Sequence, residues 1–300
     1  MSGKLIDVVQ RVKEGTAYWD WETVISEHQG HKLYIRVFAD AMKFDDVPPL
    51  TWNYQTFREY DESGEEVKRT YNGVRLPASA QELQQIADLT SCMLLTPKVV
   101  DLIWLQAKVK FDPVINSGPS QYQIVAEMPI VGRMPYRGTT LIGVHELIQE
   151  KIDTTSDGTG LVASVGKYWV LTNGLGNTSM LRFGDETACN YGWCSSSASG
   201  PGVTPGVQCW QRPGYAHDIR HWDPSQVIRL MFRTARLVRA DGTEEYVDLG
   251  DIAQDPELGP LITHEGELGI LRQPGVEELP AMQPIQLPPE TIIANPWRGA

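Results

Sequence analysis

Residues 186–233 read ETACNYGWCSSSASGPGVTPGVQCWQRPGYAHDIRHWDPSQVIRLMFR and hold three of the four cysteines and two of the six histidines. Gly, Ser and Pro crowd the middle of this stretch, which is typical of a loop. The run that closes it is apolar, with Ile228, Leu230 and Phe232 on one face of a strand. We therefore expect a Gly/Ser-rich loop that carries the chemistry of the chain and leads into a buried strand.

Two histidines in this stretch are the candidate catalytic groups. His217 and His221 have the spacing that brings two imidazoles to one face of a helix, but Gly214 and Pro224 leave little room for a helix. Imidazole titrates near neutral pH, and a carboxylate can orient it, so the cluster suits hydrolytic acid–base chemistry. We expect both histidines in one solvent-accessible pocket with one of the two aspartates. The predicted catalytic residues are His217, His221, Asp218, Asp223 and Ser225.

Other interpretations of the same residues stay open. A thiolate of Cys194 or Cys209 would be a nucleophile if it were exposed, with a histidine as its base. A metal ion held by His217, His221 and one aspartate would need a turn that brings the histidines together, and the motif H-E-x-x-H is absent. We expect neither a metal nor a cofactor. In a purely structural interpretation, the stretch is an Ω-like loop whose histidines only cap strands.

Aromatic residues surround these polar groups at high density. Aromatic side chains commonly form a wall that binds sugars or peptides. The predicted substrate-binding residues are Tyr191, Trp193, Trp210, Tyr215 and Trp222.

The cysteine spacing lacks the paired CxxC motifs of a zinc site. If a disulfide forms, we expect it to join Cys209 to Cys189 or to Cys194, because the intervening loop is long enough to close. Cys92 falls in a segment that we expect to be helical. Buried free thiols are the alternative, and they would suit a chain without an export signal.

Local signals predict about four helices. The first lies within 5–15 and the second within 79–89, where Ser79 and Glu82 form a capping box. The third follows Thr96 and Pro97, and the fourth lies within 139–152, capped by Thr139 or Thr140. His145 of the fourth helix lies on or near its apolar stripe, so a hydrogen-bonded core histidine is the expected role. A further brief helix is expected at 255–261.

Antiparallel strands are predicted between and after these helices. We expect strands at 32–38, 122–126, 168–172 and 227–232, and hairpin turns at Ser63-Gly64 and Asp241-Gly242, the second returning through 245–249. The fold class is therefore α+β, mainly antiparallel.

The chain divides into a single domain at 1–272, with a sub-boundary near 113–138, and a Pro-rich C-terminal arm at 273–300. Prolines stiffen the arm and apolar side chains are spaced along it. We expect residues 274–300 to make more contacts with another copy or another protein than with their own domain.

Composition excludes several classes of function. Thirty-eight acidic residues against 26 basic residues give a net charge of −12, which disfavours nucleic acids and anionic membranes as partners. No signal peptide, transmembrane segment or nucleotide-binding glycine motif is visible, so we expect a soluble, cytoplasmic chain. Two functions remain. One is a hydrolase acting on a polymer such as cell-wall or carbohydrate material. The alternative is a non-catalytic structural or interaction subunit of a larger assembly, such as a virion or filament.

Overall fold

The main sheet is antiparallel and has six strands. The computed structural model describes residues 6–50, 59–60, 63–67, 70–114, 141–155, 160–177, 179 and 182–282. Five strands follow the order β15-β14-β3-β13-β8, and β2 pairs with β3. Their bounds are Trp21–His28 (β2), His31–Phe38 (β3), Cys92–Leu94 (β8), Leu230–Phe232 (β13), Thr234–Val238 (β14) and Glu244–Asp248 (β15).

The hairpin of β2 and β3 was predicted only in part: a strand was expected at 32–38, which is β3, and none at β2. Its turn consists of Gln29 and Gly30, which have φ angles of 47° and 83°. Two consecutive residues at positive φ form the tight turn that suits the twist of a two-residue hairpin. In β3, the alternating residues Leu33, Ile35 and Val37 are fully buried and provide part of the core.

The predicted hairpin around Asp241 and Gly242 is confirmed, with β14 and β15 as its strands. The run at 227–232 is a separate, interior part of the sheet, where β13 lies between β3 and β8. Cys92 begins β8, so its predicted helical environment is wrong. A smaller hairpin joins Glu59–Tyr60 (β5) to Glu66–Val67 (β6) around Ser63 and Gly64, as expected.

A second sheet contains the stretch that we expected to be a loop. It has the order β11-β12-β10-β9, with bounds Lys167–Trp169 (β9), Thr187–Cys194 (β10), Gly200–Pro201 (β11) and Gln208–Asp218 (β12). The Gly/Ser-rich residues 195–207 form the connection between β10 and β12, and this connection includes the short strand β11. A third, three-stranded sheet joins Ala17–Tyr18 (β1), Lys43–Phe44 (β4) and Val74–Arg75 (β7).

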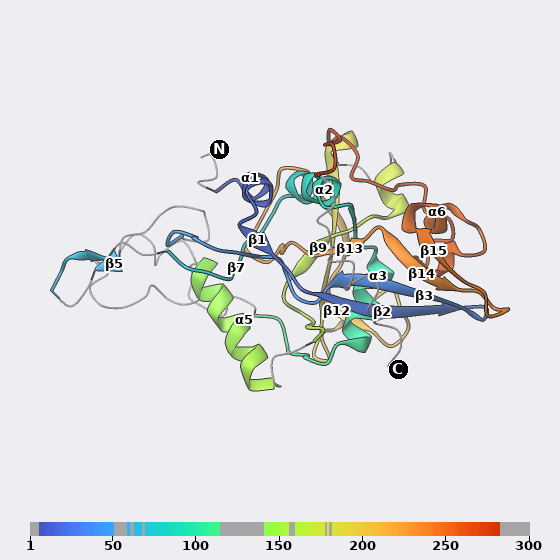
Figure 1. Cartoon of the computed structure of the whole chain (residues 1–300), viewed down its shortest axis with the longest axis horizontal. Coiled ribbons are helices and arrows are strands. Elements are labelled where there is room, and N and C mark those ends of the chain that lie inside the picture. The colour runs from blue at the N-terminus through green and yellow to red at the C-terminus, as the bar shows by residue number, and fades with distance from the viewer. Residues whose placement is uncertain are drawn as a thin grey trace.

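Five α-helices occur among the described residues, and Figure 1 shows how they are arranged around the sheets. They are Val8–Lys13 (α1), Ala80–Leu89 (α2), Pro97–Gln106 (α3), Leu141–Thr155 (α5) and Leu249–Gln254 (α6). The capping box of Ser79 and Glu82 is confirmed at α2, as is the Thr96 cap of α3. At 255–261 the chain forms a turn and a short 3-10 helix, Gly259–Leu261, because α6 has already ended. Among these helices, none combines the length and apolar composition needed to cross a bilayer.

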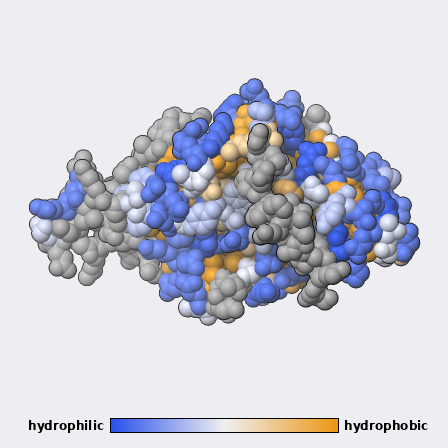
Figure 2. All heavy atoms as spheres, viewed as in Figure 1, coloured by the Kyte–Doolittle hydropathy of each residue, from blue (hydrophilic) through white to orange (hydrophobic). Residues whose placement is uncertain are grey.

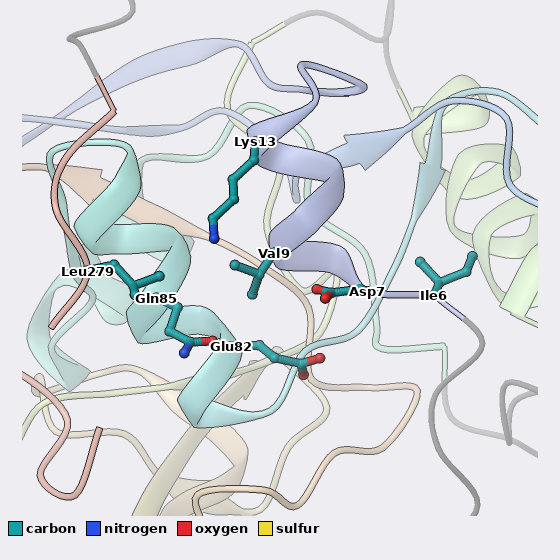
Figure 3. A pocket seen from close by; sticks show the side chains of 7 residues that line it. All are labelled: Ile6, Asp7, Val9, Lys13, Glu82, Gln85 and Leu279. Carbon is teal, nitrogen blue, oxygen red and sulfur yellow. The ribbon is translucent and has the colours of Figure 1, made fainter. Parts of the chain in front are cut away.

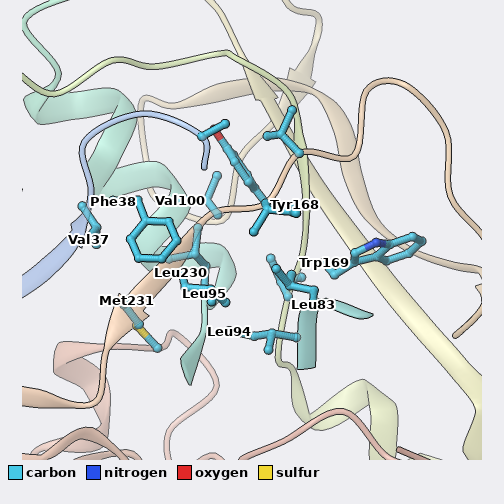
Figure 4. Close-up of a cluster of buried hydrophobic side chains, with 14 of the residues drawn as sticks. Val37, Phe38, Leu83, Leu94, Leu95, Val100, Tyr168, Trp169, Leu230 and Met231 are labelled. Carbon is cyan, nitrogen blue, oxygen red and sulfur yellow. The ribbon is translucent and has the colours of Figure 1, made fainter. Parts of the chain in front are cut away.

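One cluster of buried hydrophobic residues includes side chains from both large sheets and from α2 and α3 (Figure 4). It includes Phe38 and Leu230 of the main sheet, Leu83 of α2, and Tyr168 and Trp169 of β9. The two sheets therefore share a core. On the face shown in Figure 2, most of the described surface is hydrophilic, and the hydrophobic patches are small.

A buried arginine connects the main sheet to the second sheet. Arg229 is completely buried and donates hydrogen bonds to the carbonyl oxygens of Phe38 (2.8 Å), Ala39 (2.7 Å) and Val162 (2.6 Å). These bonds hold the end of β3 and the segment before β9 together, since a buried guanidinium requires acceptors for its donors. Arg229 thereby helps to position β9.

The described part of the C-terminal arm packs on its own domain. The Leu279 N–H donates to Asp88 of α2 (3.1 Å), and the Met282 N–H donates to the Leu89 carbonyl (3.1 Å). Residues 283–300 lie outside the described residues, as do the strand predicted at 122–126, nearly all of the sub-boundary at 113–138 and the caps Thr139 and Thr140.

Candidate functional site

Two bulges in β12 shape the surface that carries the histidines. His217 pairs with Ala188, Gly214 with Asn190, and Gln211 with Gly192, so three residues of β12 advance for every two of β10. Each extra residue interrupts the alternation of faces along the strand. Side-chain directions on β12 therefore do not follow from a simple two-residue period.

A tight turn after β12 brings the two histidines together. The His221 N–H donates to the Asp218 carbonyl (3.1 Å), and the Arg220 N–H donates to the Asp218 carboxylate (2.8 Å). The imidazole rings of His217 and His221 are stacked, with centroids 3.9 Å apart and planes 13° apart. The turn thus stacks the two imidazole rings without a helix. Asp218 stabilises this turn by accepting hydrogen bonds from the N–H groups of Arg220 and His221.

The histidine pair rests on a buried tryptophan. The Trp169 ring meets His217 and His221 edge-on, with centroid distances of 5.9 and 6.4 Å. Trp169 is 1% exposed, and its indole N–H donates to the Ala78 carbonyl (2.9 Å). This hydrogen bond fixes the tryptophan ring and, through it, the position of the imidazoles.

Asp223 adds a carboxylate beside the pair. Its Oδ2 lies 3.0 Å from Lys167 Nζ and 3.8 Å from His221 Nε2, and its Oδ1 accepts hydrogen bonds from the Ser225 N–H and hydroxyl. Burial raises the pKa of Asp223, but His221, Lys167 and Ser225 outweigh this effect and hold the pKa well below its usual range. Asp223 is therefore ionised at neutral pH.

The surroundings of His217 disfavour its charged form. Burial lowers the pKa of His217, and the neighbouring His221 and Lys167 lower it further. A neutral His217 has one ring nitrogen that accepts a proton. The side chain of His221 is 36% exposed, so the pair borders solvent. A shared pocket around the two histidines stays a prediction.

The predicted serine is hydrogen-bonded to a carboxylate. Ser225 Oγ donates to Asp223, and among the described residues it has no hydrogen bond to an imidazole nitrogen. A serine nucleophile is usually activated by an adjacent base. The structure thus shows Ser225 orienting Asp223, and its catalytic role stays a prediction.

The predicted aromatic wall is only partly at the surface. Trp210 is 46% exposed and Trp222 is half-buried, while Trp193 lies under the Lys167 ammonium, 5.1 Å from its ring centre. Tyr191 is completely buried, and its hydroxyl donates to Asp101 (2.6 Å). Because it cannot contact a substrate, its predicted substrate-binding role is wrong. The half-buried Tyr215 shares a hydrogen bond with Thr172 (2.7 Å).

The expected disulfide is confirmed between Cys194 and Cys209, which are paired residues of β10 and β12. Neither sulfur is a free thiolate, so the cysteine-nucleophile interpretation is wrong. Cys92 and Cys189 are buried free thiols, and burial raises the pKa of each to about 12. They lack the lowered pKa that a reactive cysteine needs.

The histidine cluster is not arranged as a three-ligand metal site. Within the described ranges, only Asp101, Cys194 and Cys209 bring three ligand atoms within 4.8 Å of one another.

A hollow between α1 and α2 has a partly polar lining, which includes Asp7, Lys13 and Glu82 (Figure 3). Asp7 and Glu82 there serve as helix-cap groups, so we assign the hollow no chemistry.

Three residues that contact the site are not among the predicted site residues. Lys167 and Trp169 come from β9, and Gln226 accepts the Asp223 N–H through its side-chain oxygen (2.9 Å) while fully buried. Lys167 interrupts an apolar run, which is the one local signal that a charge there has a partner. The contacts themselves depend on how β9 and β12 are brought together.

The comparisons with known proteins add no relative. No family model, curated protein or solved structure matches the chain.

Proposed function

We propose that the chain is a hydrolase of a polymer, such as cell-wall or carbohydrate material, in which His217 and His221 perform acid–base catalysis. The observation that carries this proposal is the stacked pair itself, 3.9 Å between ring centroids, with the Asp223 carboxylate on one side of it. Two imidazolium ions in such contact would repel each other, so one ring is favoured as a base and the other as an acid.

The roles follow from the surroundings of each ring. His217, with its lowered pKa, would take a proton from water while the water oxygen bonds to the substrate carbon. A protonated His221 would form an ion pair with Asp223 and would donate its proton to the leaving oxygen or nitrogen as that bond breaks. Exchange of protons with solvent would then restore both rings.

An acyl bond of the polymer, either an ester or an amide, suits this arrangement better than a glycosidic bond. Glycosidases usually place two carboxyl groups on either side of the sugar, one of them as a protonated acid. Asp223 is held ionised by His221, Lys167 and Ser225, and Asp218 is used in the turn, so neither is available as that acid.

The tryptophans support a sugar- or peptide-containing substrate. Trp210 and Trp222 belong to the segments that enter and leave the histidine turn, and flat indole faces stack well on sugar rings.

The disulfide bears on where the protein is located, since such bonds persist in oxidising surroundings. We therefore favour a location outside a reducing cytoplasm over the cytoplasmic one expected from the sequence.

The test is release of soluble fragments from purified cell-wall polymer and from acylated polysaccharide, with mass spectrometry of the new chain ends. His217→Ala should lower the rate at least about 100-fold, which is the usual contribution of a general base. The control is His28→Ala at the end of β2, which should retain the wild-type rate.

Equal activity of the His217→Ala variant and the wild type would refute the proposed site. A wild-type chain that releases nothing from any of these polymers would instead favour the alternative, a non-catalytic subunit of a virion, filament or other assembly. Circular dichroism of each variant separates a lost catalyst from a lost fold.

A further inference from the structure

A second cluster of reactive groups lies on the core side of β10 and β12, apart from the histidines. Asp101 of α3 is completely buried beside Cys194 and Cys209. Its Oδ1 accepts the Tyr191 hydroxyl (2.6 Å), and its Oδ2 accepts the Thr204 N–H (2.6 Å). These two hydrogen bonds fix the carboxylate so that Oδ1 faces both sulfur atoms.

Asp101 has no ion-pair partner among the described residues. Burial without such a partner makes the charged form of its carboxyl group costly. Its Oδ1 lies 3.7 Å from Cys194 Sγ and 3.8 Å from Cys209 Sγ. Disulfide sulfurs carry no hydrogen, so in the oxidised protein these two contacts are not hydrogen bonds.

The same distances match a tetrahedral zinc site. Zinc bonds of about 2.3 Å to sulfur and about 2.1 Å to oxygen place a sulfur and an oxygen ligand about 3.6 Å apart. Both sulfur-to-oxygen distances are already close to that value. Only the two sulfurs must separate, and breaking their bond allows this.

We propose that the Cys194–Cys209 disulfide, once reduced, becomes a zinc site with Asp101 as the third protein ligand. A dithiol supplies two electrons and two protons, becomes a disulfide itself and leaves two thiols on the chain. Zn²⁺ then displaces both thiol protons and binds two thiolates and one carboxylate, with a fourth position for water. Reducing surroundings therefore favour the metal form, and oxidising surroundings favour the disulfide.

Tyr191 is a positioning residue for this site. Its hydroxyl lies 3.3 Å from Cys209 Sγ as well as 2.6 Å from Asp101, and it accepts the Val203 N–H (3.1 Å). Hydrogen bonds of this kind orient a carboxylate ligand and typically contribute about 10- to 100-fold in metal affinity.

The experiment titrates the full chain with Co²⁺, which reports thiolate ligands by sulfur-to-cobalt charge-transfer absorption. The protein reduced by dithiothreitol and freed of reductant should bind one Co²⁺ per chain with this absorption, and the oxidised protein should show none. Asp101→Asn should weaken binding about tenfold or more. The control is the Cys92→Ser/Cys189→Ser double variant, which should bind as the wild type does.

Absence of the absorption in the reduced wild type would overturn the proposal, as would its loss in the Cys92→Ser/Cys189→Ser control. Because Asp101→Asn risks unfolding, a second measurement uses the wild type alone. Zn²⁺ should raise the melting temperature of the reduced chain and leave that of the oxidised chain unchanged. An equal effect on both forms would also overturn the proposal.

Discussion

Two clusters among the described residues each combine an aspartate, a cation and histidine, and they differ in what the cation contacts. Between β7 and α5, Arg75 donates both to Asp40 (3.1 Å) and to His145 Nδ1 (3.0 Å). Beside β9, Lys167 contacts Asp223 (3.0 Å), and the imidazoles stack on each other. A donor aimed at an imidazole nitrogen occupies its basic site, so His145 is a structural group. Among the described residues, no donor is aimed at a ring nitrogen of His217.

The largest expected effect is on the buried cluster. Arg75→Met removes a guanidinium whose side chain is 1% exposed and leaves Asp40 without that partner. We expect the free energy of unfolding to fall by about 3–5 kcal/mol in urea denaturation, as for a broken buried ion pair. The matched control is Arg220→Met, which breaks the exposed Arg220–Glu186 pair and should change stability little. Equal effects of the two changes would contradict the assignment of Arg75.

The pH dependence of stability is the next test. Burial, followed by the charges of Arg75 and Lys43, lowers the pKa of His145 to about 4 in the folded protein. An unfolded histidine titrates near pH 6.5, so between about pH 6.5 and 4 the unfolded chain binds the extra proton and stability falls as pH falls.

We expect this group to lower the free energy of unfolding by about 2 kcal/mol between pH 7 and pH 5. The His145→Gln variant should lose that part of the pH dependence, measured by urea denaturation at both pH values. An unchanged slope in the variant would show that His145 is protonated equally in both states.

A smaller loss of stability is expected at the histidine pair. Asp223→Asn keeps the shape of the side chain and removes the charge that Lys167 and His221 face. The free energy of unfolding should fall by about 1–2 kcal/mol, as for one charged hydrogen bond at a partly exposed position. A loss as large as that of Arg75→Met would place Asp223 among the structural groups instead.

Local signals predicted elements well where neighbouring residues determine them. The capping box at Ser79, the Thr96-Pro97 start and the Asp241-Gly242 turn each depend on residues within a few positions, and all three are confirmed. The hydrogen-bonded role expected for His145 is confirmed as well, since its position on the helix indicated it. Strand β2 was missed, although the glycine of the Gln29-Gly30 pair that follows it suits the positive φ angle found there.

The site itself was less predictable, because it depends on pairing between distant strands. His217, His221 and Asp223 were identified from their density in the sequence, and the structure brings them together. The inward direction of Tyr191 was missed, since contact with Asp101 of α3 decides it. Lys167 and Trp169 were missed because β9 meets the histidine turn only through tertiary packing.

The most direct test of the account is an NMR titration of the histidine side chains in the wild type and in His221→Asn. In the wild type, His217 should titrate below an ordinary histidine, because burial and the adjacent His221 lower its pKa. Removal of the stacked imidazole should raise the His217 midpoint and leave His145 unchanged. A His217 that titrates like an ordinary histidine in the wild type, with the same midpoint in the variant, would contradict a coupled acid–base pair.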